Sequence, residues 1–126
     1  MIKALLFDFD GLIIDTETPD YQTWEEIFAD HGAILTKDVW SSNIGHFGSF
    51  NPYEYLEEQV GREVDRRAVH DRRVKRYQEL CEQALILPGV LDMIQQAKAR
   101  NLKLAVASNS FGKWVYPHLK RLNLYD

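Results

Sequence analysis

The feature that most constrains the fold is an apolar run near the N-terminus that two aspartates interrupt. Residues 2–9 are almost continuously apolar, Asp8 and Asp10 lie at the carboxyl end of the run, and Gly11 follows. An apolar run of this length is typical of a strand that is covered on both faces of a parallel sheet. Because carboxylates are costly to keep among apolar side chains, two of them at this point predict a chemical role.

The rest of the chain predicts one more buried strand, over residues 102–107, and several helices. Capping residues, glycines and apolar spacing place these helices at 17–31, 36–43, 51–61, 65–83, 90–100 and 111–122. The order of strands and helices indicates an α/β fold class. An all-helical segment, 17–86, is then inserted into a sheet-based domain formed by residues 1–16 and 87–126.

Composition excludes several classes of protein. The chain has 126 residues, 15 basic and 19 acidic side chains, and a formal net charge of −4, so neither nucleic acid nor a membrane is an expected partner. Arginines concentrated in residues 62–76 alternate with acids and predict a solvated helix face with i,i+4 ion pairs. Acidic residues break the N-terminal apolar run, which excludes a signal peptide. The single cysteine, Cys81, fits a reducing cytoplasm.

Polar residues lie directly after both predicted strands. Asp8 and Asp10 end the first strand, and Ser108, Asn109 and Ser110 come after the second. If the strands are parallel neighbours, these groups share one crevice at the carboxyl edge of the sheet. Mg²⁺ would hold two close carboxylates ionised and bridge them to phosphate, and a carboxylate is also a possible nucleophile. A chance pair of acids on a loop is the alternative.

Two stretches carry a specific resemblance. "DFDGLIIDTE" (8–17) and "LAVASNS" (104–110) resemble the first two signatures of the haloacid dehalogenase-like hydrolase superfamily. The helical insertion and "LPGV" (87–90) resemble the subgroup that contains beta-phosphoglucomutase and phosphoglycolate phosphatase. The resemblance implies a Rossmann-like parallel-sheet core with an inserted α-helical cap over 17–86.

The resemblance also implies roles for individual residues. Asp8 is expected to be the nucleophile and a magnesium ligand. Asp10 is expected to be the general acid/base and to bind the metal through its backbone carbonyl. Ser108 and Asn109 are expected to hold the transferring phosphoryl group. The implied protein is a magnesium-dependent phosphatase of a small phosphorylated metabolite that works through an aspartyl-phosphate.

The chain departs from the family pattern after the second signature. The family continues with a lysine and then with further metal-binding acids, and Lys113 and Lys120 lie in a predicted helix too early to match. Without those groups phosphoryl transfer loses charge stabilisation. We therefore expect these 126 residues to be part of a longer protein, inactive alone, and able to self-associate or domain-swap through an exposed sheet edge.

Two alternatives remain open. The first is a truncated, non-catalytic module that binds phosphate or a partner chain. The second is a sugar-phosphate mutase, but Asp20 stands where such mutases carry a histidine, and the loop at 44–52 lacks their arginine. A phosphatase is therefore favoured over a mutase. His46, in that loop, is a candidate substrate contact, although a plain surface histidine is the favoured interpretation.

Overall fold

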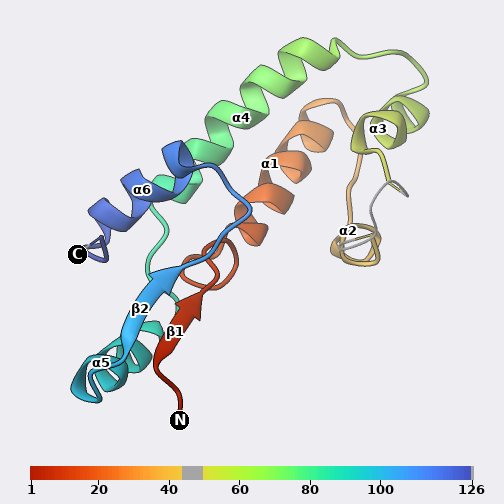
Figure 1. Cartoon of the computed structure of the whole chain (residues 1–126). Helices are drawn as coiled ribbons and strands as arrows, with labels where there is room; N and C mark the ends of the chain where they lie inside the picture. Colours follow the sequence, from red (N-terminus) through yellow and green to blue (C-terminus); the bar gives the residue numbers. More distant parts are fainter. Residues whose placement is uncertain (44–49, 126) are drawn as a thin grey trace. The chain divides into compact units, whose positions relative to one another are not determined.

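The computed structural model describes residues 1–43 and 50–125 and divides the chain into two compact units. One unit combines Met1–Glu17 with Cys81–Asp126, and the other is Thr18–Leu80. The elements follow one another (Figure 1) as β1 Ala4–Phe7, α1 Glu17–Asp30, α2 Lys37–Ser41, α3 Pro52–Val60, α4 Arg66–Glu82, α5 Val90–Ala99, β2 Lys103–Val106 and α6 Gly112–Arg121. The predicted α/β class is confirmed.

The sheet of the first unit pairs β1 with β2 in parallel. Leu5 lies opposite Leu104, and Phe7 lies opposite Val106. The predicted parallel neighbours are therefore correct (Figure 1). Both strands are shorter than the predicted 2–9 and 102–107. At the end of β1 the reason is a tight turn in which Gly11 adopts a φ of 75°.

The prediction that both strands are covered on both faces is wrong for the described structure. Side chains alternate across a strand, so Phe7 points to one face and Leu6 to the other. The face of Phe7 packs against residues of α5, α6 and the turn after β1, among them Phe9, Ile13, Ile14, Val90, Val115 and Leu119. On the opposite face Leu6 is 67% exposed, because nothing in the described chain packs there closely enough to bury it.

The chain leaves and re-enters the first unit at one place. Ile14 and Ile86 form an antiparallel bridge, and the Leu87 N–H donates to the Ile13 carbonyl at 2.8 Å. The Arg121 guanidinium also donates to the backbone carbonyls of Cys81 and Ala84. These bonds tie the end of α4 to α6. The compact helical unit ends at Leu80, and the helical insertion over 17–86 stays a prediction.

The second unit is helical and has its own core. The predicted apolar face of α1 is confirmed, since its apolar side chains are buried together with residues of α3 and α4: Tyr21, Trp24, Ile27, Phe28, Leu56 and Val69. Predicted helix ends are also confirmed. The Asn51 side chain caps α3, Gly61 closes it in the left-handed conformation with a φ of 68°, and the Asp65 carboxylate accepts from the Ala68 N–H.

The arginines of α4 form ion pairs, but not those that sequence spacing predicted. Their partners are mainly acids of α1 and α3: Arg66 with Glu57, Arg72 with Asp30, Arg73 with Asp20 and Arg76 with Glu26. The i,i+4 interpretation is wrong because α4 lies beside α1 and α3, whose carboxylates are within reach of its arginine side chains. None of the helices within residues 1–43 and 50–125 has the length and apolar character that crossing a membrane requires.

Candidate active site

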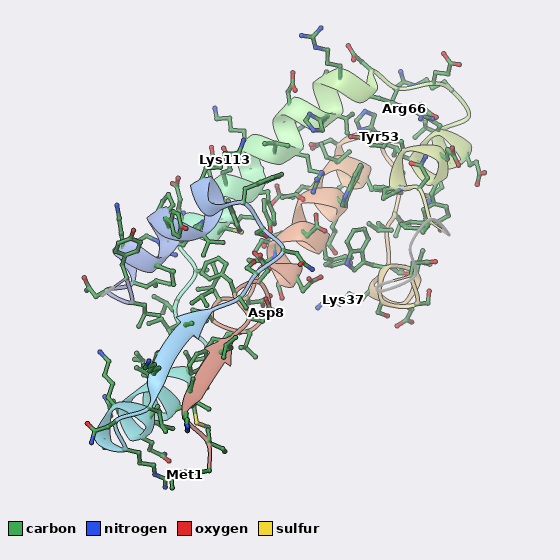
Figure 2. The ribbon with its side chains drawn as sticks, viewed as in Figure 1. Met1, Asp8, Lys37, Tyr53, Arg66 and Lys113 are labelled. Carbon is green, nitrogen blue, oxygen red and sulfur yellow. The ribbon has the colours of Figure 1, made fainter. Side chains whose placement is uncertain are left out.

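The carboxyl ends of β1 and β2 border an open cleft of about 650 Å³. Its lining comprises Leu6, Phe7, Asp8, Val106, Ala107, Ser108 and Asn109. Three of the four predicted site residues, Asp8, Ser108 and Asn109, thus meet at one edge of the sheet, because parallel strands end on the same side. Figure 2 shows Asp8 where β1 ends.

Asp8 presents an exposed side chain at this edge. One of its carboxylate oxygens, Oδ1, accepts a hydrogen bond from the Phe9 N–H at 2.7 Å. Phe9 itself is completely buried, so the backbone after Asp8 is anchored in the core of the unit. The backbone at Asp8 is therefore held in place, while the Asp8 side chain faces the open cleft.

Asp10 is not among the residues that line the cleft. Its carboxylate accepts two hydrogen bonds from the segment that comes after β2: Ser110 Oγ donates to Oδ2 at 2.5 Å, and Trp114 Nε1 donates to Oδ1 at 3.0 Å. Sequence reasoning placed Ser110 in the same crevice as Asp10, but it gave neither partner a contact with the Asp10 carboxylate. The sequence offered only one signal, that both residues lie close to the end of the second strand. Which side chains of α6 face Asp10 depends on how the helix is rotated about its axis, and the sequence does not show this.

The Ser-Asn-Ser segment forms a closed turn. The Ser110 N–H donates to Ser108 Oγ at 3.0 Å. A hydroxyl has one proton and two acceptor positions, so Ser108 can still donate a hydrogen bond. The turn therefore leaves a hydrogen-bond donor at the end of β2, in the cleft that Asp8 also lines.

The other residues that the sequence singled out lie elsewhere. The Lys113 ammonium group lies 5.7 Å from the centre of the Phe111 ring, and that of Lys120 lies 4.8 Å from the centre of the Tyr125 ring. Neither lysine lines the cleft. In the helical unit, Asp20 pairs with Arg73; burial raises the pKa of Asp20, and Arg73 acts in the opposite direction. His46 lies outside the described residues.

The donor set at the cleft fits a magnesium ion of the kind that retains several waters. Mg²⁺ prefers oxygen ligands and often takes only one or two carboxylates from the protein. Asp8 offers a carboxylate with an exposed side chain. Within residues 1–43 and 50–125, no group of three or more His, Cys, Asp or Glu side chains is arranged to hold a metal.

Comparison with known proteins settles the family. A family model described as "Hydrolase: haloacid dehalogenase-like hydrolase" matches residues 2–126. The chain belongs to the haloacid dehalogenase-like hydrolases. The match covers both strands, the helical unit and the cleft, so the resemblance noted in the two strand-end signatures extends over nearly the whole chain.

Curated relatives of this haloacid dehalogenase-like hydrolase include proteins named as phosphatases. YhcW of Bacillus subtilis (strain 168), which carries a phosphatase name, is 45% identical over 126 residues, covering 100% of this chain and 57% of the relative. "Phosphorylated carbohydrates phosphatase" of Thermotoga maritima is 26% identical, covering 98% of this chain and 57% of the relative. The chain thus spans a little over half of the length of these relatives.

A solved structure shows the same fold at low sequence identity. The HAD family hydrolase of Deinococcus radiodurans R1, whose crystal contains bound phosphate and sodium, matches with a TM-score of 0.75 and 20% identity. The match covers 98% of this chain and 53% of that one. The likeness confirms the predicted Rossmann-like α/β fold of this family.

Proposed function

We propose that this protein acts as a magnesium-dependent phosphatase of a small phosphorylated metabolite. The observation that carries the proposal is the cleft at the carboxyl edge of β1 and β2, which brings an exposed carboxylate, Asp8, beside a hydroxyl, Ser108, and an amide, Asn109. An anionic, oxygen-rich substrate matches a hydroxyl and an amide as donors, and a carboxylate as nucleophile. The phosphatase names of the relatives support the same reaction class.

In the proposed first step an Asp8 carboxylate oxygen attacks phosphorus, and the bond from phosphorus to the ester oxygen breaks. Asp10 gives its proton to the leaving oxygen, so the alcohol departs neutral and Asp8 carries the phosphoryl group. In the second step Asp10 takes a proton from water, whose oxygen attacks the same phosphorus. The bond between phosphorus and the Asp8 oxygen breaks and inorganic phosphate leaves. Asp8 is then an ionised carboxylate again and Asp10 is protonated again.

The other groups of the cleft bind rather than react. Ser108 and Asn109 are proposed to donate to the phosphoryl oxygens as charge moves onto them. Mg²⁺, held by the Asp8 carboxylate and the Asp10 backbone carbonyl, would supply positive charge to that phosphoryl group. In this proposal the unit of Met1–Glu17 and Cys81–Asp126 is the catalytic core, and the helical unit Thr18–Leu80 is the cap. The one cysteine of the chain supports a cytoplasmic location.

The test is phosphate release by the full-length gene product, measured on a panel of small phosphate esters with and without Mg²⁺. Asp8→Asn removes the nucleophilic oxygen and should lower turnover by at least about 10³-fold. Asp92→Asn is the matched control: it makes the same change at an exposed residue in the first turn of α5 and should keep the activity of the unmodified protein.

Turnover that survives Asp8→Asn would overturn the proposed chemistry. The competing function, a non-catalytic module that binds phosphate or pairs with a second copy through the exposed sheet edge, has a different signature. Such a module would bind inorganic phosphate or sediment as a dimer, yet release no phosphate from any ester, and Asp8→Asn would change only its binding.

A further inference from the structure

Two hydrogen bonds hold the Asp10 carboxylate against the segment that comes after β2. Ser110 Oγ donates to Oδ2 at 2.5 Å, and Trp114 Nε1 donates to Oδ1 at 3.0 Å. Hydrogen bonds that end on a carboxylate are stronger than bonds between neutral groups. Together they join the turn after β1 to the first turn of α6 and restrict the orientation of the half-buried Asp10 side chain.

Packing behind Trp114 sets the direction of its indole N–H. The His118 ring meets the Trp114 ring edge to face at 4.5 Å between centres, and His118 also lies against Phe9 at 5.9 Å. His118 is only 5% exposed, and its Nδ1 accepts from the Arg121 guanidinium at 3.3 Å. The Trp114 indole therefore packs against the buried His118 ring, which is itself held by the hydrogen bond from Arg121.

The Ser-Asn-Ser turn sets the direction of Ser110. Its backbone N–H is bonded to Ser108 Oγ, and Ser108 lines the cleft beside Asp8. One closed turn thus places Ser108 at the cleft and directs the Ser110 hydroxyl to Asp10. The two partners of Asp10 differ in kind, because an indole N–H only donates whereas a hydroxyl both donates and accepts.

We propose that Ser110 and Trp114 are positioning residues for Asp10, and that together they fix the orientation of its carboxylate. The Trp114 indole N–H can only donate, so it holds Oδ1 in place as an acceptor. The Ser110 hydroxyl donates to Oδ2, so each oxygen of the carboxylate has its own partner and the side chain is held in one orientation. The role of Asp10 as acid and base rests on the proposed function; the two contacts do not.

The contact with Trp114 has a readout that needs neither substrate nor metal. The chain contains three tryptophans, and Trp114→Phe assigns the ¹H–¹⁵N signal of its indole. Asp10→Asn should move that signal upfield, because a neutral amide replaces the charged acceptor, while the signals of Trp24 and Trp40 stay in place. An unmoved Trp114 signal would overturn the proposal, whether or not the protein turns over any ester.

The positioning role is tested by kinetics on the full-length protein. Trp114→Phe and Ser110→Ala should each lower kcat by about 10-fold to 100-fold, while KM stays within about twofold, since a misoriented acid slows the reaction more than binding. Ser110→Thr keeps the hydroxyl and should recover most of the rate, which a purely structural role of Ser110 would not predict. Equal unfolding midpoints of the variants exclude a folding defect.

Two kinetic results would overturn the role. One is an unchanged kcat in Trp114→Phe and Ser110→Ala under conditions in which Asp8→Asn abolishes turnover. The other is a Ser110→Thr variant that is as slow as Ser110→Ala. Failure of the proposed function looks different: the Asp8→Asn control would then have no effect, and the indole signal alone would decide whether Trp114 holds Asp10.

Discussion

The two compact units differ in how fully their apolar residues are covered. In the helical unit Phe28 and Leu56 are completely buried and Ile27 is 2% exposed. In the sheet-containing unit the Phe7 face of the sheet is covered, but Leu6 on the other face is 67% exposed. The core of the helical unit is formed by residues of that unit, whereas the sheet has one face on which Leu6 stays exposed. The first prediction, with the largest effect, tests this difference directly.

Phe28→Ala should lower the free energy of unfolding by about 3–5 kcal/mol, because it opens a cavity among buried aromatic side chains. Leu6→Ala removes a side chain of similar apolar character from an exposed position and should change that free energy by no more than about 0.5 kcal/mol. Urea denaturation followed by far-UV circular dichroism gives both values. A cost above about 1 kcal/mol for Leu6→Ala would show that the open face is covered in solution.

The ion pairs of α4 provide a comparison inside the helical unit. Arg73 pairs with Asp20 at 2.5 Å, lies over the Trp24 ring with its guanidinium carbon 5.0 Å from the ring centre, and has a side chain that is 21% exposed. Arg73→Met should cost about 1–2 kcal/mol, because it leaves the partly buried Asp20 without its partner.

Arg72→Met is the control, since Arg72 pairs with Asp30 where both side chains are more exposed, 59% and 44%. An exposed pair should contribute less than about 1 kcal/mol. The same urea titrations measure both variants. Equal costs would show that burial and ring stacking add nothing to the pair between Arg73 and Asp20.

The smallest effect concerns pH and the sheet-containing unit. Burial lowers the pKa of His118, and the nearby Arg121 lowers it further, while Glu82 and Asp10 act in the opposite direction. The folded protein therefore takes up a proton at His118 less readily than the unfolded chain. Stability should be full above the ordinary histidine pKa of about 6.5 and should fall as the pH drops below it.

Urea titrations at two pH values, one about a unit above the ordinary histidine pKa and one about a unit below it, measure the loss by tryptophan fluorescence. His118→Phe keeps a ring between Phe9 and Trp114 and should reduce the pH dependence. His70→Gln, at an exposed residue of α4, should leave it unchanged. A dependence that persists in His118→Phe would assign it to other groups.

Much of the fold was predictable because its signals are local. Helix ends depend on bonds within about four residues, and Asn51, Gly61 and Asp65 mark them as predicted. The parallel pairing of the two strands followed from their apolar character, and the meeting of Asp8 with Ser108 followed from that pairing. The strand ends were predicted less well, because the turn at Gly11 shortens β1.

The sequence by itself determined the order of the elements, the helix caps, the parallel strand pair and the family signatures, since each depends on neighbouring residues or on strand polarity. Only the tertiary structure decided which sheet face is covered, which acids pair with the arginines of α4, and that Asp10 is bonded to Ser110 and Trp114. The contacts of Arg76 with Glu26 and of Trp114 with Asp10 join residues 50 and 104 positions apart. They depend on the phase and placement of packed helices, which no local pattern encodes.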